Sequence, residues 1–272
     1  MALSVVVVSY NARAVLRECL RRLTAHYPEA ELLVVDTGSS DGSGAMVRSE
    51  FPQARLIAVA NRGYAYAVNR GLEHTQGAYT AVMNSDIYLE PGDLEALQHA
   101  LDEEPTAALA GPVLLTPSGR LQSFGLFYAP NYWRLRKPRP VSWLSGALLL
   151  VRRAALERLG GMDERFFFYN EDLEWGLRAR RLGFKNLLVP RRVLHLGGAS
   201  TPSDPRFIAE GYRGGLLLSA EYYPWLHRLH RKAVWLEAHL RLYLDRNPTR
   251  RKGYRLLADW LTEKNVNESL FI

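Results

Sequence analysis

The chain is short of cysteine, and it contains no apolar run long enough to cross a membrane. Cys19 is its one cysteine in 272 residues, which excludes an internal disulfide and is typical of a reducing compartment. Because Cys19 falls at helical spacing with Leu16 and Leu20, we expect it to lie in the core rather than to act as a nucleophile. A membrane span needs about 20 apolar residues, and the first residues carry no signal-peptide pattern. We therefore expect a cytoplasmic protein, either soluble or attached only to the surface of a membrane.

Motifs that mark several common kinds of site are also missing. No G-x-G-x-x-G follows a strand-like run and no G-K-[ST] is present, so the sequence offers neither a dinucleotide fingerprint nor a P-loop. H-E-x-x-H and paired C-x-x-C motifs are absent too, which argues against a structural zinc site. The glycine-rich stretch "DTGSSDGSG" (36–44) is explained at least as well by a flexible turn as by phosphate binding.

The positive charge of the chain is concentrated at one end. The formal net charge is +7, and residues 205–272 carry 12 Lys and Arg against 7 Asp and Glu. Such a basic segment suggests an anionic partner, which could be nucleic acid, lipid or nucleotide. Charge alone does not separate these three partners.

Strands and helices are predicted to alternate through the first hundred residues. The strand-like runs are apolar throughout and cover residues 3–9, 31–36, 54–59 and 78–86. Helical spacing follows each run, over residues 12–26, a short segment ending at 51, residues 64–75 and residues 91–104. This alternation is typical of a parallel sheet covered by helices on both faces. Ligands of such sheets bind beyond the carboxyl ends of the strands.

The alternation ends near residue 105. The elements predicted beyond it are a hairpin at 113–124, a basic and aromatic loop at 131–140, a buried strand at 143–151, a helix at 170–182 and helices from 206 nearly to the end.

Acidic residues stand where predicted strands end. Asp36 closes "ELLVVD", Asp86 closes "AVMNSD", and Glu171 and Asp172 follow "RFFFYN". Each acid taken alone is most simply a turn or helix-cap residue. Because the carboxyl ends of the strands share one edge, however, the sheet would direct all of these acids into a single cleft.

Six blocks of sequence follow one another from about residue 3 to residue 200. They are "VVVVSYN", "VVDTGSSDGS", "NRGYAYAVNRG", "MNSD", "SGALLLVRR" and "GGMDERFFFYNEDLEWGLRARRLG". In this order they resemble the family 2 glycosyltransferases of the GT-A fold, and among these the rhamnosyltransferase-like enzymes of cell-wall and surface-polysaccharide assembly. The resemblance implies an α/β fold with a mostly parallel sheet, in which residues 1–104 bind a nucleotide sugar and residues 105–204 bind the acceptor. Residues 205–272 would form a helical, basic extension.

The resemblance also implies an inverting reaction, in which an acceptor hydroxyl displaces a nucleoside diphosphate from the anomeric carbon of a sugar. UDP or dTDP is the favoured carrier, because Asp36 matches an acid that accepts a hydrogen bond from a uracil or thymine imide. The acceptor would be a saccharide, free or linked to a lipid. Further contacts with the nucleotide sugar are implied for Ser9, Tyr10, Asn11, Asn61, Gly63, Asn69, Asn84 and Ser85.

The stretch "NSD" (84–86) occupies the place of the family's D-x-D motif but retains a single acid, Asp86. The resemblance implies a divalent cation, Mn²⁺ or Mg²⁺, that would bind Asp86 and the diphosphate oxygens. His195 ends an apolar run in "VLHLGGAS" and is implied as a further metal ligand, with a core or loop role equally open.

Glu171 and Asp172 match the family's acidic pair. A helix N-terminus lowers the pKa of a carboxyl group, whereas the apolar surroundings offered by "FFFY" raise it. Such opposed effects suit a catalytic acid better than a simple cap. The resemblance therefore assigns Asp172 as the general base and Glu171 as a contact to the acceptor hydroxyl or to the start of the helix.

Two other functions have less support in the sequence. A sugar-1-phosphate nucleotidyltransferase needs a glycine-rich, basic loop after its first strand, whereas "VSYNARAVL" supplies only Arg13 and no glycine. Nucleic-acid binding through the basic end lacks any recognised module, so we expect no nucleic-acid partner.

The C-terminal segment carries an apolar stripe and basic clusters. The stripe follows helical steps through Leu226, Leu229, Ala233, Leu236, Leu240 and Tyr243. We predict that the stripe packs on the catalytic domain or on a second subunit. Basic and aromatic residues project to another side of the helix and continue beyond it, namely Arg228, Arg231, Trp235, Arg246 and the cluster at 246–255. Contact with an anionic membrane and a merely solvated basic face explain these residues equally well.

Overall fold

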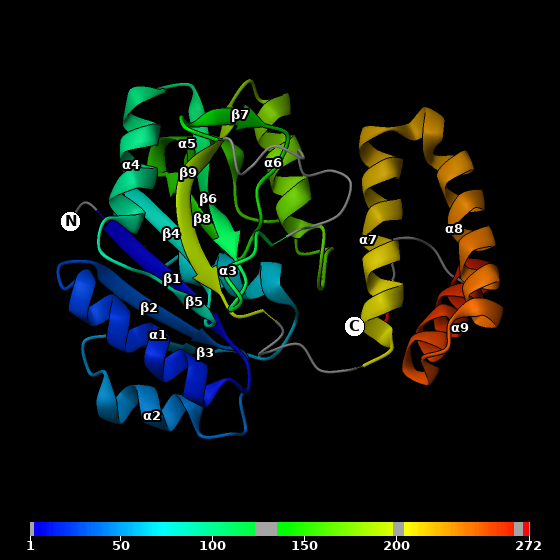
Figure 1. Cartoon of the computed structure of the whole chain (residues 1–272), viewed down its shortest axis with the longest axis horizontal. Coiled ribbons are helices and arrows are strands. Elements are labelled where there is room, and N and C mark those ends of the chain that lie inside the picture. The colour runs from blue at the N-terminus through cyan, green and yellow to red at the C-terminus, as the bar shows by residue number, and fades with distance from the viewer. Residues whose placement is uncertain (1–2, 123–134, 198–203, 264–268, 272) are drawn as a thin grey trace.

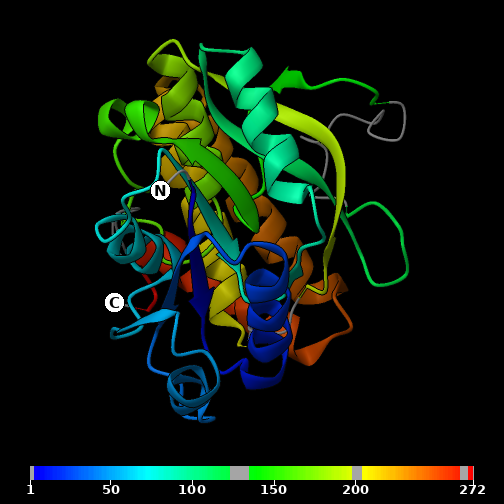
Figure 2. The same cartoon turned by 90° about the vertical axis from the view of Figure 1, so that its left-hand side faces the viewer.

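The computed structural model describes the chain except for residues 1–2, 123–134, 198–203, 264–268 and 272. Its N-terminal part is a sheet flanked by helices, and its C-terminal part is a group of three helices beside the sheet (Figure 1). When the sheet part is viewed from its far side, the three helices lie behind it (Figure 2). The predicted α/β fold with a helical extension is confirmed.

Parallel strands form the first half of the sheet. In sheet order they are β3 (Arg55–Ala58), β2 (Glu31–Asp36), β1 (Leu3–Ser9) and β4 (Tyr79–Asn84). The helices that follow them in the chain are α1 (Arg13–His26), α2 (Ser43–Glu50), α3 (Tyr64–Leu72) and α4 (Asp93–Glu103). β4 ends at Asn84, two residues before the end of the strand predicted at 78–86. The chain turns there, at Ser85 and Asp86, into the short strand β5 (Ile87–Tyr88).

The second half of the sheet is mixed rather than parallel. Its elements are β6 (Ala107–Leu115), β7 (Arg139–Val141), β8 (Leu148–Arg152), α5 (Arg153–Leu159), α6 (Glu171–Arg181) and β9 (Lys185–His195). β8 runs antiparallel to both β4 and β6, while β9 runs parallel to β6. β5 and β7 pair antiparallel with β9. Within the hairpin predicted at 113–124, the structure has one antiparallel bridge, between Leu115 and Leu121. Residues 123–124 of that hairpin and residues 131–134 of the predicted loop lie outside the described residues.

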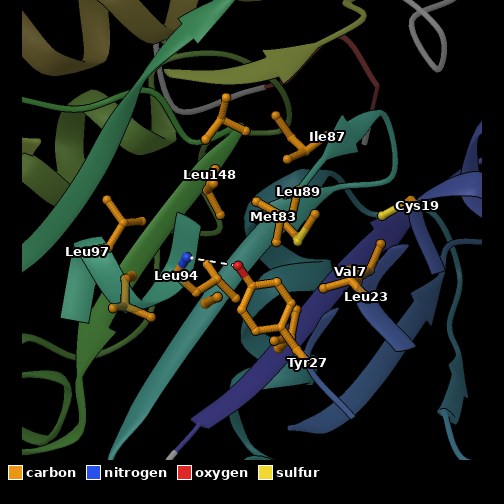
Figure 3. Packing of buried hydrophobic residues seen from close by; sticks show 14 of the residues in the cluster. Val7, Cys19, Leu23, Tyr27, Met83, Ile87, Leu89, Leu94, Leu97 and Leu148 are labelled. Atoms are coloured by element: carbon orange, nitrogen blue, oxygen red, sulfur yellow. Dashed lines mark hydrogen bonds between the residues drawn. The ribbon is translucent and has the colours of Figure 1, made fainter. Parts of the chain in front are cut away.

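The strands bury side chains on both faces of the sheet. Along β1, Val5 and Val7 join the core beneath α1 and α4, whereas Val6 joins the core beneath α3, α5 and α6. This is the two-residue alternation of a strand, and it explains why the apolar runs are continuous. Within the first core, the Tyr27 hydroxyl accepts a hydrogen bond from the backbone N–H of Leu94, which joins the end of α1 to α4 on the same face of the sheet (Figure 3).

The C-terminal helices α7 (Arg206–Tyr222), α8 (Pro224–Leu244) and α9 (Pro248–Glu263) have a core of their own, which includes Val234 and Ala238 of α8. α8 makes its helix contacts with α7 and α9 and lies on the far side of α7 from the sheet (Figure 1). None of the helices within the described residues could span a bilayer.

The apolar stripe predicted on α8 does not pack on the catalytic part. Its exposed members are Leu229, Leu236, Leu240 and Tyr243, at 64%, 61%, 56% and 86% of full exposure. The prediction of packing on the catalytic domain is therefore wrong. It failed because the inner face of α8 is narrow and uses small side chains, which leaves the larger apolar ones outside.

Candidate active site

A cavity of about 910 Å³ opens at the carboxyl ends of the strands. Residues at the ends of four strands line it. They are Val8, the next-to-last residue of β1, Thr37 just after β2, Asn84 at the end of β4 and His195 at the end of β9. Parallel strands leave their last residues at one edge, so residues distant in the sequence meet here. Of the four acids predicted to share one cleft, Asp86, Glu171 and Asp172 line this cavity, whereas Asp36 is not among its lining residues.

The acidic pair sits at a strained turn that leads into α6. Tyr169 and Asn170 both have left-handed backbones, with φ of 68° and 71°. Such conformations are unfavourable for residues with a side chain and persist where the surroundings hold them. Here the Asn170 side-chain amide donates to the carbonyl of Gly211 in α7 at 2.9 Å, and the side chain of Asn170 does not cap α6. The turn therefore positions Glu171 and Asp172 at the cavity instead of serving as an ordinary helix cap.

Asp172 is a partly buried carboxylate that accepts two backbone hydrogen bonds. The N–H of Gly146 donates to Oδ2 and the N–H of Leu173 donates to Oδ1, each at 2.7 Å. Burial raises the pKa of Asp172, and these two N–H donors oppose that shift because they stabilise the charged form. The Tyr64 hydroxyl donates to the Gly146 carbonyl at 2.8 Å, which holds this peptide in place from the other side.

Glu171 differs from its neighbour in having fewer partners. Burial, together with the charge of Asp172, raises the pKa of Glu171 to about 8. Its Oε2 atom is buried and has no hydrogen-bond partner within the described part of the chain. Glu171 therefore holds its proton near neutral pH, while the two N–H donors to Asp172 favour the charged form of that neighbour.

Tyr64 lies among all three acids. Its hydroxyl is buried, and burial together with the charges of Glu171, Asp172 and Asp86 raises its pKa well above the ordinary value. The three carboxyl groups thus line one cavity, although Asp86 comes from the turn after β4 and the other two come from α6.

Asp86 and His195 form the other polar group of the cavity. Their Oδ1 and Nε2 atoms lie 3.2 Å apart, and both side chains are buried. The Nδ1 atom of His195 lies 2.7 Å from the Gln122 side-chain oxygen, an acceptor for a proton on Nδ1, so Nε2 is the ring nitrogen that faces Asp86. The backbone N–H of Gly197 donates to the other oxygen of Asp86 at 3.1 Å.

This arrangement fits a divalent cation that is held only in part by the protein. A buried carboxylate oxygen and a neutral imidazole nitrogen are both metal ligands, and Gln122 orients the imidazole from behind. Among the described residues, no group of three or more His, Cys, Asp or Glu side chains is arranged so that it could hold a metal ion by itself. A cation at Asp86 and His195 would therefore take its remaining ligands from a bound diphosphate and from water.

The residues expected to contact the nucleotide sugar are divided between two places. Tyr10, Asn61, Gly63 and Asn84 line the cavity. Gly63 has φ of 101°, and a Cβ atom there would meet the carbonyl oxygen of Phe167 at 2.4 Å, so only glycine fits.

The other expected contacts lie beside the cavity rather than in its wall. The Asp36 carboxylate accepts a hydrogen bond from the Ser39 hydroxyl at 2.5 Å, and Asn11 accepts from the backbone N–H of Ser40 at 2.8 Å. The bond between Asn11 and Ser40 joins the loop after β1 to the loop after β2. Ser9 and Ser85 are buried, and their hydroxyls have no hydrogen-bond partner in the part of the chain that the structure describes.

Asn69 takes part in a different interaction from the expected one. Its side chain donates to the Met162 carbonyl at 2.8 Å and accepts from the Met162 N–H at 2.8 Å. It also donates to the Glu164 carboxylate at 2.9 Å. Because the amide is occupied by residues 162–164, we remove Asn69 from the proposed donor contacts and regard it as a brace for the loop before the acidic pair.

The C-terminal helices complete the cavity, which the division at residue 204 did not anticipate. Arg206, Phe207 and Phe271 line it. Phe271 stacks on Phe167 with ring centroids 4.3 Å apart, and the Arg206 guanidinium lies 4.4 Å from the Phe271 ring. No sequence signal marked Phe271, because its partners are over 60 residues away in the chain.

A buried ion pair anchors this segment. The Glu210 and Arg213 side chains are fully buried and pair at 2.5 Å within α7. Glu210 also accepts hydrogen bonds from the Ser269 hydroxyl at 3.2 Å and the Leu270 N–H at 3.3 Å. These bonds fix residues 269–271 against α7 and so place Phe271 in the cavity wall.

Comparison with known proteins agrees with this geometry. The profile of "Glycosyl transferase family 2" matches residues 4–160. An N-acetylglucosaminyl-diphospho-decaprenol L-rhamnosyltransferase of Mycobacterium tuberculosis is 31% identical over 94% of this chain and 97% of its own length. The O-antigen biosynthesis protein RfbC of Myxococcus xanthus is 28% identical over 74% of this chain and 17% of its own length.

Solved structures share the fold at low identity. GalNAc-T7 with UDP, GalNAc and Mn²⁺ has a TM-score of 0.64 and 16% identity, and the match covers 97% of this chain and 56% of that one. Mannosyltransferase PcManGT from Pyrobaculum calidifontis, in complex with GDP-Man and Mn²⁺, has a TM-score of 0.60 and 20% identity, covering 94% of this chain and 85% of that one. With the family profile matching more than half of the residues and a relative 31% identical almost from end to end, the chain belongs to glycosyl transferase family 2 and is a glycosyltransferase.

Proposed function

We propose that the protein transfers a sugar from a nucleoside diphosphate to a hydroxyl of a lipid-linked saccharide, with inversion at the anomeric carbon. The observation that carries the proposal is the meeting of the Glu171–Asp172 pair and the Asp86–His195 pair in one cavity. The first pair offers a base for the acceptor, and the second offers ligands for a cation beside the leaving group.

In the proposed reaction, Asp172 accepts the proton of the acceptor hydroxyl as the hydroxyl oxygen attacks the anomeric carbon. The bond from that carbon to the diphosphate oxygen breaks, and its electron pair leaves with the diphosphate. Asp172 suits this role because its hydrogen bonds from Gly146 and Leu173 favour its charged form and fix its position. Glu171 keeps its proton near neutral pH and can donate a hydrogen bond to the acceptor.

Asp86 and His195 would hold Mn²⁺ or Mg²⁺, which supplies positive charge to the diphosphate. Mn²⁺ accompanies the nucleotide or nucleotide sugar in GalNAc-T7 and in PcManGT, which supports the same class of cofactor here. Tyr10, Asn61 and Gly63 would contact the nucleotide sugar, with Asp36 and Ser9 behind them. We favour UDP or dTDP as the carrier.

The acceptor class is proposed from the rhamnosyltransferase of Mycobacterium tuberculosis, whose name specifies a decaprenol-linked N-acetylglucosaminyl diphosphate. We extend to this chain a saccharide on a polyprenyl diphosphate and a role in cell-wall or surface-polysaccharide assembly, at the inner face of the membrane. No nucleic acid takes part in the proposed function.

The test is a donor screen followed by a transfer assay. Thermal shifts are measured with UDP-, dTDP- and GDP-sugars, each with Mn²⁺ and with EDTA. The donor that stabilises the protein is then incubated with polyprenyl-diphosphate N-acetylglucosamine, with dTDP-L-rhamnose as the first candidate. Metal-dependent stabilisation and a new disaccharide product are expected. Release of pyrophosphate from a nucleoside triphosphate and a sugar phosphate would instead indicate a nucleotidyltransferase.

A further inference from the structure

The outward face of α8 carries large apolar side chains that none of the described residues covers. Within the part of the chain that the structure describes, the α8 stripe consists of Trp225, Leu229, Leu236, Leu240 and Tyr243, all more than half exposed. At 100° per residue these five fall within an arc of roughly 60° on the helix. The buried residues Val234 and Ala238 lie on the opposite side, against α7 and α9. In an ordinary surface helix the larger apolar side chains face the core, whereas those of α8 face outward.

Such a surface requires a partner. Soluble monomers seldom expose a continuous apolar strip along a helix of 21 residues. α8 also lies on the far side of α7 from the sheet, and in the described part of the chain its helix contacts are with α7 and α9 (Figure 1).

The charges around the stripe indicate which partner fits. Arg228 and Lys232 are exposed along one edge of α8, and Arg246, Arg251 and Lys252 are exposed just beyond its end. The acids nearby are already paired, Glu237 with Arg241 at 3.4 Å and Asp245 with Arg250 at 3.1 Å. The face offered to a partner is therefore apolar in the middle and positively charged at its border.

We infer that the α8 stripe docks the protein on an anionic lipid bilayer. Aliphatic side chains enter the outer acyl region, while Arg and Lys contact lipid phosphates. Trp225 and Tyr243, near the two ends of the stripe, have the amphipathic rings that favour the headgroup level. A second copy of the chain fits less well, because a twofold interface would bring the same basic border from both subunits together.

Docking by α8 would bring the cavity to the membrane. α7 lies between α8 and the sheet, and its first residues Arg206 and Phe207 line the cavity. The basic start of α9 lies close by, since a Cβ atom on Gly253 would meet the Pro205 carbonyl oxygen at 2.7 Å. This consequence rests on the proposed function, in which the acceptor is lipid-linked, whereas the docking itself does not.

The experiment measures co-sedimentation of the full chain with vesicles and uses no sugar donor or acceptor. Wild type is compared with the triple variant Leu229→Ser, Leu236→Ser, Leu240→Ser on phosphatidylglycerol and phosphatidylcholine vesicles. We expect wild type to bind phosphatidylglycerol vesicles at low salt and the triple variant to bind at least about tenfold more weakly. Leu182→Ser, at an exposed leucine after α6, is the matched control and should bind as wild type does. The double variant Arg228→Gln, Lys232→Gln should lose affinity for the anionic vesicles only.

Several results would overturn the inference. One is a wild type that does not sediment with phosphatidylglycerol vesicles at low salt, and another is a triple variant that sediments as well as wild type. A wild type that is dimeric in sedimentation equilibrium, with a monomeric triple variant, would identify the stripe as an interface between copies. Circular dichroism and thermal shifts with the donor nucleotide verify that the variants fold. Transfer of sugar to a water-soluble acceptor should be unchanged in the triple variant. Failure of the proposed function would appear in the donor screen, whereas failure of the docking inference would appear in the vesicle assay.

Discussion

At the scale of single residues, Glu171 and Asp172 show how hydrogen bonds divide the roles of two adjacent carboxyl groups. Burial raises the pKa of both carboxyl groups. Asp172 accepts two backbone N–H hydrogen bonds, whereas the Oε2 atom of Glu171 lacks a partner among the described residues. Asp172→Asn keeps the size of the side chain and removes its charge. We expect nucleotide-sugar binding to persist and transfer to fall by about 10²-fold or more. Single-turnover assays with the identified acceptor measure this, and wild-type turnover would show that Asp172 is not the base.

Glu171 should make stability depend on pH. Its pKa is about 8 in the folded chain and has a reference value of 4.5. Between these values the folded chain holds a proton that the unfolded chain releases, so stability falls as pH rises through this window. Glu171→Gln cannot ionise and should lack this decline. From about pH 5 to about pH 9, urea denaturation should show wild type losing at least about 1 kcal/mol relative to the variant. Glu29→Gln, at an exposed carboxyl, is the control, and parallel curves for all three proteins would contradict the shifted pKa.

Substitution of Asp86 tests whether a cation binds beside His195. Asp86→Ala removes the carboxylate that faces His195 and should abolish the Mn²⁺ dependence of UDP or dTDP binding in calorimetry. His195→Ala should have a smaller effect, because the diphosphate and Asp86 would still provide oxygen ligands. Glu95→Ala, at an exposed acid of α4, should bind as wild type does. Equal wild-type affinity in EDTA and in Mn²⁺ would remove the cation from the proposal.

At the scale of elements, β1, β2 and β4 could be predicted because each is buried on both faces and reads as a nearly unbroken apolar run. The direction of the α8 stripe could not be predicted. The spacing of three and four residues is the same whether an apolar face points into the molecule or out of it. Asn69 shows a similar limit, since the sequence identifies a polar residue near a site but not that Met162 and Glu164 already occupy its amide.

The segment before β8 gives a prediction at this scale. A Cβ atom on Gly146 would lie 3.0 Å from the Cβ atom of Asp172, so Gly146→Ala must move the base or its supporting peptide by a few tenths of an ångström. Catalysis is sensitive to such displacements, and we expect transfer to fall by about tenfold or more while the protein stays folded. Gly215→Ala, where the nearest atom is 3.7 Å away, is the matched control. Unchanged steady-state transfer by Gly146→Ala would mean that this contact does not fix Asp172.

At the scale of the whole molecule, the cavity is closed by residues from both parts of the chain. The strand ends and the acidic pair come from the sheet part, and Phe271 is brought to them by the hydrogen bonds between Glu210 and residues 269–270. The sequence predicted a catalytic domain and an extension, yet a shared cavity depends on contacts between distant residues that have no local pattern.

Phe271→Ala tests whether this shared wall belongs to the acceptor half of the cavity. The ring stacks on Phe167, close to the acidic pair, with an interplanar angle of 4°. Its removal should leave Asp86 and His195 unchanged, so donor affinity should persist. Sugar rings stack on flat aromatic faces, and we expect the KM for the acceptor to rise by about tenfold, with a smaller change in kcat. Steady-state rates with the acceptor varied at saturating donor measure this, and Leu182→Ala is the control. An unchanged acceptor KM would make Phe271 a packing residue, whereas a loss of donor affinity would place it beside the nucleotide sugar.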